Sequence, residues 1–120
     1  MAKKESVDII SQGDLAVVAF KATSISNLKG IGAASKQINK FLEQEHPVKI
    51  IFDFSGVKFF SSQVLGLLLD IRARLKLCDG EVVISGIDPQ VHRVFKITSL
   101  DKIFRFFSDR ESAVEQINAG

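Results

Sequence analysis

The sequence predicts an α/β domain, with a mixed and mostly parallel five-stranded sheet and about four helices packed on it. Two apolar strand-like segments near the N-terminus flank a turn, which indicates an antiparallel hairpin. After a first helical segment, runs of branched and aromatic residues alternate three times with segments of helical period. This alternation implies parallel strands joined by right-handed crossovers, in the order β-β-α-β-α-β-α-β-α. We expect a single domain over residues 1–120, a length that can bury a proper core.

The hairpin is predicted from two apolar segments and the glycine between them. VDII (7–10) and LAVVAF (15–20) flank SQGD, where Gly13 can supply the positive backbone angle of a tight turn. The stretch that follows, KATSISNLKG (21–30), is polar and irregular, and we expect no regular element there.

The first helix and the central strand come next. From about Ile31 the apolar residues recur at helical spacing, and the amphipathic helix is expected to end before Pro47. The predicted inner face of this helix consists of Ala34, Ile38, Phe41 and Leu42. VKIIFDF (48–54) is apolar almost throughout, which is typical of a central strand covered on both faces.

A strong helix is predicted from Ser62 to Cys78. Its apolar residues Val64, Leu68, Ile71 and Leu75 lie on one face. Lys76 falls in the last turn, and Asp79-Gly80 supplies a C-terminal stop. We expect Phe59 and Phe60, just before this helix, to lie in the core, with the alternative that one of them contributes to a contact surface.

The last third of the chain predicts two strands, each followed by a helix. EVVIS (81–85) is a short buried strand, and Asp88-Pro89 starts a helix with a capping carboxylate and a proline at the first position. KIFRFF (102–107) is expected to form the final strand, at an edge of the sheet. Ser108 and Glu111 are predicted to form a capping box for the last helix. The inner faces of these two helices are predicted to consist of Val91, Val94 and Phe95 and of Ala113, Val114 and Ile117.

Composition excludes several classes of partner and site. Sixteen basic residues against fourteen acidic ones, a net charge of +2, are too balanced to indicate nucleic acid. No segment reaches the roughly 18 unbroken apolar residues that a membrane span needs, and the N-terminus does not read as a secretory signal. The single Cys78 allows no internal disulfide, and His46 and His92 lack metal-ligand partners at usable spacing and are expected at the surface. We therefore expect a cytoplasmic protein with no metal and no cofactor.

Two segments are similar to enzyme motifs but lack residues that those motifs need. GIGAASK, from Gly30, is glycine-rich but lacks the Gly-Lys-Ser/Thr ending of a P-loop and follows a polar segment rather than a strand. Ser62, between a strand and a helix, is similar in position to the nucleophile of a hydrolase, but Phe60 and Val64 stand where that turn needs glycines. We expect no enzyme, and keep a small serine hydrolase as the remaining alternative.

The adjacent hydroxyls of Ser61 and Ser62 have a structural and a functional explanation. One serine can cap the helix by accepting a hydrogen bond from an otherwise unpaired backbone N–H, worth about 1 kcal/mol. Its neighbour would then lie in the first turn, partly exposed at the carboxyl edge of the sheet, where ligands and partners of open α/β sheets meet the protein. Helix N-termini tolerate phosphate well, because their free N–H groups and the helix dipole favour negative charge.

At this point the sequence resembles the STAS domain, the module of bacterial anti-sigma factor antagonists. The resemblance covers residues 7 to about 117 and depends on four motifs in order: DFSGV (53–57), the Ser-Ser helix start, Leu65-Gly66, and ITSLDKIF (97–104). In the family pattern the second helix starts Asp-Ser-Ser-Gly-Leu-Gly. Here Ser61 stands in the place of the aspartate, Gln63 of the second serine and Val64 of the glycine.

The resemblance implies partner switching. The unmodified antagonist binds an anti-sigma factor that is a serine kinase, so that a sigma factor is released; phosphorylation releases the antagonist, and a serine phosphatase resets it. The pattern places the phosphate acceptor at Ser62, with Ser61 as the alternative. The expected partner-binding residues are Lys58, Ser61, Ser62 and Gln63. We expect a monomer or weak dimer; the runner-up function is a STAS scaffold, never phosphorylated, in a signalling or transporter assembly.

Overall fold

Five strands form the central sheet in this computed structural model, which describes residues 7–21, 24–25 and 28–119. They are β1 (Val7–Gln12), β2 (Leu15–Phe20), β4 (Lys49–Asp53), β6 (Glu81–Ser85) and β7 (Arg105–Phe107), in the spatial order β1-β2-β4-β6-β7. β1 and β2 pair antiparallel across a turn in which Gly13 has a φ of 62°, and the other neighbours pair in parallel. The mixed, mostly parallel five-stranded sheet of an α/β fold is thereby confirmed, with β7 at an edge as expected.

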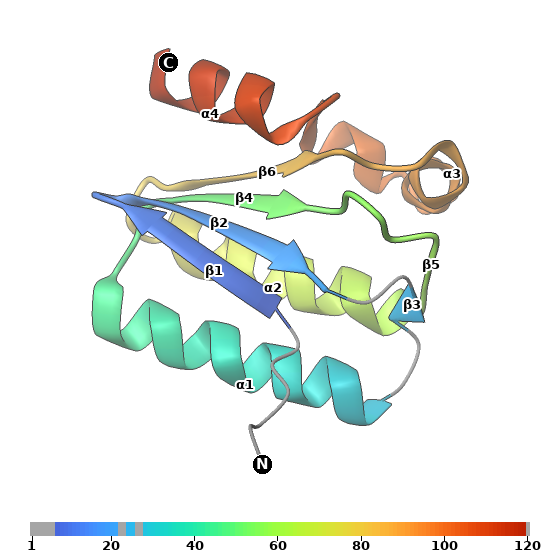
Figure 1. Cartoon of the computed structure of the whole chain (residues 1–120), viewed down its shortest axis with the longest axis horizontal. Coiled ribbons are helices and arrows are strands. Elements are labelled where there is room, and N and C mark those ends of the chain that lie inside the picture. The colour runs from blue at the N-terminus through green and yellow to red at the C-terminus, as the bar shows by residue number, and fades with distance from the viewer. Residues whose placement is uncertain (1–6, 22–23, 26–27, 120) are drawn as a thin grey trace.

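Helices cover both faces of the sheet (Figure 1). They are α1 (Leu28–Glu45), α2 (Ser62–Lys76), α3 (Pro89–Ile97) and α4 (Arg110–Ala119). Figure 1 shows α1 and α2 side by side under one face, α4 on the opposite face, and α3 beyond the carboxyl end of β6. The predicted order of elements is confirmed, although α1 begins at Leu28, so that Gly30 lies inside the helix and not in a loop.

The alternation of side chains between the two faces of the sheet explains why the middle of β4 is apolar throughout. Ile50 and Phe52 face the core shared with α1, α2 and α3, whereas Ile51 faces the core under α4. All three side chains are fully buried. The predicted inner face of α2 is buried as well, which fixes the rotation of that helix on the sheet.

Two further elements were not predicted. β3 (Ser24–Ile25) and β5 (Phe59–Phe60) pair in parallel to form a separate two-stranded sheet. The polar stretch 21–30 therefore includes a short strand, although residues 22–23 and 26–27 lie outside the described part. The final strand is shorter than expected, because Leu100–Lys102 form a 3-10 turn before it.

The helix boundaries follow from their polar flanks. The Asp88 carboxylate accepts a hydrogen bond from the Gln90 N–H at 2.9 Å and caps α3, as predicted. The predicted Ser108–Glu111 capping box is wrong, because α4 begins at Arg110 and the residue directly before it is Asp109. The Asp109 carboxylate accepts from the Ser112 N–H at 2.7 Å and takes the capping position instead.

After α2, Asp79 adopts the left-handed conformation with a φ of 58°. Gly80 serves close packing, since a Cβ there would lie 2.4 Å from the Val48 carbonyl oxygen.

The described residues contain no candidate membrane span and no candidate metal site. None of the helices in the described ranges is long and apolar enough to cross a bilayer. Those ranges also hold no group of three or more His, Cys, Asp or Glu side chains arranged for a metal ion. His46 is exposed as expected, whereas His92 is only partly exposed, because its ring packs against Phe106 with 4.6 Å between centroids.

Candidate functional site

The candidate site lies where the chain passes from the carboxyl end of β4 into α2. Here β5 pairs with β3 and brings the first turn of α2 to the carboxyl edge of the sheet (Figure 1). Ligands of open α/β folds commonly bind at this edge. The predicted partner-binding residues, Lys58 and 61–63, are close together because they are nearly consecutive in the chain.

Ser61 is the N-cap residue of α2, but its side chain does not cap. Its extended backbone (φ −86°, ψ 160°) lets its N–H donate to the Ile25 carbonyl at 2.9 Å, and its own carbonyl accepts from the Val64 N–H at 3.0 Å. The hydroxyl oxygen is buried, and no hydrogen-bonding partner reaches it in the described part of the chain. Capping by the Ser61 hydroxyl, one of the two roles expected for the pair, is therefore not observed. Its backbone instead anchors α2 to β3.

Ser62 occupies the first helical position and is exposed, as is Gln63 beside it. The first turn of α2 carries no acidic residue, so the positive end of a 15-residue helix dipole is not neutralised there. An anionic group on Ser62 would meet free backbone N–H groups and a favourable dipole. Another protein can reach this hydroxyl-bearing side chain without unfolding the domain.

The residues before the serines divide between surface and core. The Lys58 ammonium donates to the Asp88 carboxylate at 2.9 Å, a pair that ties β5 to the start of α3. This lysine, and the backbone bond from Gln90, lower the pKa of Asp88. Phe59 lies outside the core and is the one of the two phenylalanines at the surface, because its side chain is 64% exposed. Phe60 packs inward and stacks on Phe95, with 5.7 Å between ring centroids.

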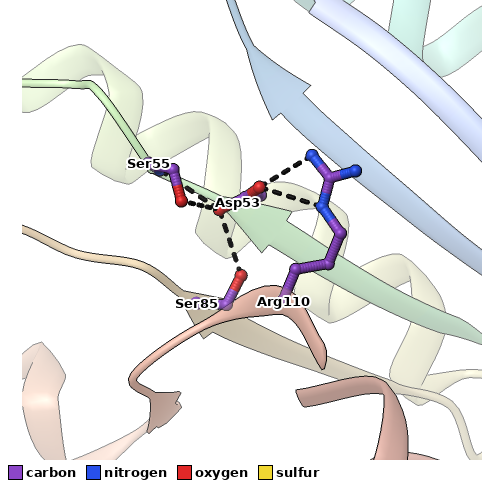
Figure 2. Close-up of polar contacts among 4 residues, drawn as sticks. All are labelled: Asp53, Ser55, Ser85 and Arg110. Carbon is purple, nitrogen blue, oxygen red and sulfur yellow. Dashed lines mark hydrogen bonds and ion pairs between the residues drawn. The ribbon is translucent and has the colours of Figure 1, made fainter. Parts of the chain in front are cut away.

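A second polar cluster fixes the end of β4 (Figure 2). The Asp53 carboxylate accepts from the Ser55 hydroxyl at 2.7 Å and the Ser55 N–H at 3.1 Å, and from the Arg110 guanidinium at 2.8 and 3.0 Å. The Ser85 hydroxyl lies 3.3 Å from the same carboxylate, across the β4–β6 pairing. The cluster thus joins β4, β6 and α4 at the point where the chain leaves the sheet toward the serines.

Burial raises the pKa of Asp53, but its hydrogen bonds outweigh burial. The Ser55 hydroxyl, the Arg110 guanidinium and the Ser55 N–H all stabilise the charged form, and the Arg110 charge adds to them. The net pKa of Asp53 is below its ordinary value. All described contacts of this cluster are made with residues of the same fold. We therefore interpret the cluster as structural support for the loop that leads from β4 to β5.

Comparison with known proteins identifies the family. A model of the STAS domain matches residues 17–113, which is most of the chain. Many solved structures share the fold, and three serve as examples. The anti-sigma factor antagonist SpoIIAA in its unphosphorylated form is 17% identical, with 95% of this chain and 97% of that chain covered and a TM-score of 0.83.

The second is an anti-sigma-factor antagonist (STAS) domain protein from Planctomyces limnophilus. It is 19% identical, with 96% of this chain and 99% of that chain covered and a TM-score of 0.84. The third, the Bacillus cell fate determinant SpoIIAA in its phosphorylated form, is 18% identical, with 92% and 98% covered and a TM-score of 0.72. At these identities the likeness establishes the fold alone, whereas the match over residues 17–113 establishes the family: the chain belongs to the STAS domain family.

Proposed function

We propose that the protein is an anti-sigma factor antagonist that is switched off by phosphorylation of Ser62. In this proposal the unmodified protein binds an anti-sigma factor serine kinase and so releases a sigma factor. A single observation carries the proposal: a STAS domain exposes a serine at the first position of α2, at the carboxyl edge of its sheet. The fold is similar to that of SpoIIAA, a protein with both an unphosphorylated and a phosphorylated form.

The local environments favour Ser62 over Ser61 as the acceptor. A kinase must bring the hydroxyl oxygen to the terminal phosphate of its nucleotide, and the Ser61 oxygen is buried. Ser62 is exposed and needs no rearrangement of β3 or β5 to be reached. Ser61 then acts through its backbone, which holds the start of α2 in place.

The energy that the switch needs is modest. A hundredfold loss of affinity corresponds to about 2.7 kcal/mol. A phosphoserine carries nearly two negative charges at neutral pH, and burying such an unpaired anion against a partner costs several kcal/mol. Since the helix N-terminus favours the phosphate in the free protein, the modification would block docking and leave the fold intact.

The remaining parts of the proposal follow from this role. The protein acts by binding, without catalysis or a cofactor, in the cytoplasm, as a monomer or weak dimer. A serine phosphatase acting on the phosphorylated form resets it, and nucleic acid and membranes are not partners. Lys58, Ser62 and Gln63 form the centre of the partner surface, to which the exposed Phe59 adds apolar area. Ser61, which was also expected there, supports this surface through its backbone, because its hydroxyl oxygen is buried.

The test is to incubate the protein with serine kinases from its own genome and to map the phosphate by mass spectrometry. We expect one phosphate, on Ser62, that is absent from Ser62→Ala. The matched control is Ser61→Ala, which removes a neighbouring but buried hydroxyl and is expected to leave phosphorylation unchanged. Ser62→Ala is expected to keep its binding to the kinase and to be insensitive to ATP-dependent release.

Other outcomes favour the alternatives. If a kinase binds the protein firmly and both serines stay unmodified, the switch is wrong and a STAS scaffold in a signalling or transporter assembly becomes the better account. Acylation by a serine-reactive probe, blocked by Ser62→Ala, would instead favour the hydrolase.

A further inference from the structure

A shallow groove of about 370 Å³ lies beside the serines, between β5 and α3. Its lining includes Phe59 of β5 and Lys58 directly before that strand. From α3 it includes Gln90, Arg93 and Val94. We refer to it as the β5–α3 groove. Ile97 lies one helical turn beyond Arg93 on the same side of α3 and is 75% exposed, which extends the apolar surface.

The groove is lined mainly by apolar side chains, and its charged side chains are basic. Phe59 and Ile97 are two of the largest exposed apolar side chains in the described part of the chain. The charged side chains that line the groove, Lys58 and Arg93, are both basic. The Asp88 carboxylate is occupied by Lys58 and by the N-terminus of α3, whereas Arg93 forms no ion pair with any residue in the described ranges.

From this combination we propose that the β5–α3 groove docks an acidic, aliphatic segment of a partner protein. A carboxylate of the segment pairs with Arg93, whose planar guanidinium suits two parallel hydrogen bonds to a carboxylate. Leucine-like side chains of the segment cover Phe59, Val94 and Ile97. A basic or uncharged segment gains no such pairing, so charge selects the partner more than apolar area does.

The groove also extends the proposed switch, and this step rests on the proposed function. Ser62 is separated from the end of β5 by one residue and from Phe59 by two. A phosphate on Ser62 adds negative charge next to a groove that binds an acidic segment. Repulsion of the segment then weakens docking, without any change in the groove itself.

The test uses an amphipathic helical peptide of leucine and glutamate, added to the ¹⁵N-labelled full chain and followed by two-dimensional NMR. We expect amide shifts to cluster in 58–60 and 90–97. Arg93→Glu should weaken the peptide affinity by at least about tenfold. The matched control is Lys40→Glu, the same reversal of charge on the exposed side of α1, which should change the affinity by less than twofold.

Two results would overturn the proposal. One is that the shifts fall on other elements or do not occur. The other is that the same peptide with lysine in place of glutamate binds 58–60 and 90–97 as tightly. Both measurements use unphosphorylated protein, so the groove can stand when the Ser62 proposal fails.

Discussion

At the scale of single residues, two adjacent serines with the same chemistry have different environments. The hydroxyl of Ser61 is buried and its backbone is held by β3, whereas Ser62 is exposed at the first position of α2. The local sequence predicted that one serine would cap α2 through its hydroxyl and that the other would be exposed, but it did not say which, because serine is common at both positions of a helix start. The family resemblance placed the acceptor at Ser62, and the expected hydroxyl cap is not observed. The contact that decides it, from Ser61 to Ile25, joins segments more than thirty residues apart.

Asp53→Asn tests the polar cluster around the Asp53 carboxylate. The change keeps the size of the side chain and removes the charge that pairs with Arg110. We expect a loss of about 2 kcal/mol in the free energy of unfolding at neutral pH, below the usual figure for buried pairs because the Arg110 side chain is about a third exposed.

The pH dependence of that loss has a definite sign. The folded pKa of Asp53 is depressed, so its contribution is complete above the unfolded pKa of about 3.9 and is lost as the pH falls through the folded pKa. Urea unfolding of both proteins across pH should show their difference shrinking below about pH 4. A difference that stays constant down to pH 3 would contradict this interpretation.

Gly86→Ala tests the packing next to the cluster. Gly86 has a φ of 65°, and an added Cβ would lie 2.3 Å from the Ser55 hydroxyl oxygen, which must then abandon Asp53. We expect a loss of about 2–3 kcal/mol in thermal or urea unfolding. Gly13→Ala is the matched control, with a φ of 62° and no atom within 4 Å, so backbone strain alone should cost about 1 kcal/mol. Equal losses in the two variants would show that the contact with Ser55 does not matter.

At the scale of elements, the sequence predicted what periodicity alone decides. α2 and β4 have long, regular apolar patterns, and both form as expected. β3 and β5 have two residues each, too short for a pattern, and they exist only because the fold brings them together. The orientation of Phe59 could not be predicted because β5 was not predicted. Side chains alternate along a strand, so Phe59 points outward while Phe60 packs inward.

The cap of α4 gives a prediction at this scale. Ser108 and Asp109 are both good capping residues, and only the register of the helix selects between them. We expect Asp109→Ala to lower the unfolding free energy more than Ser108→Ala, as measured by thermal unfolding. The bonds from Ser112 lower the pKa of Asp109, so this contribution is present at neutral pH and is lost as the pH falls through the folded pKa. A larger effect from Ser108→Ala would restore the capping box.

At the scale of the whole molecule, the parallel sheet determines where the candidate functional residues lie. Strands β4, β6 and β7 all end at one edge, and the loops that follow them bring the Asp53 cluster, β5 and the starts of α2 and α3 to that end of the molecule (Figure 1). The sequence predicted this edge from the strand–helix alternation. It did not predict that α3 lines a groove together with β5, because Arg93 and Ile97 resemble any solvated helix face until β5 is placed beside them.

The most direct test of the central claim compares the kinase affinity of the unmodified protein with that of protein carrying phosphoserine at position 62, installed during synthesis. We expect the Kd to rise at least about a hundredfold, with an unchanged NMR spectrum away from 58–64. Phosphoserine at position 62 that changes the Kd by less than about threefold would contradict the account.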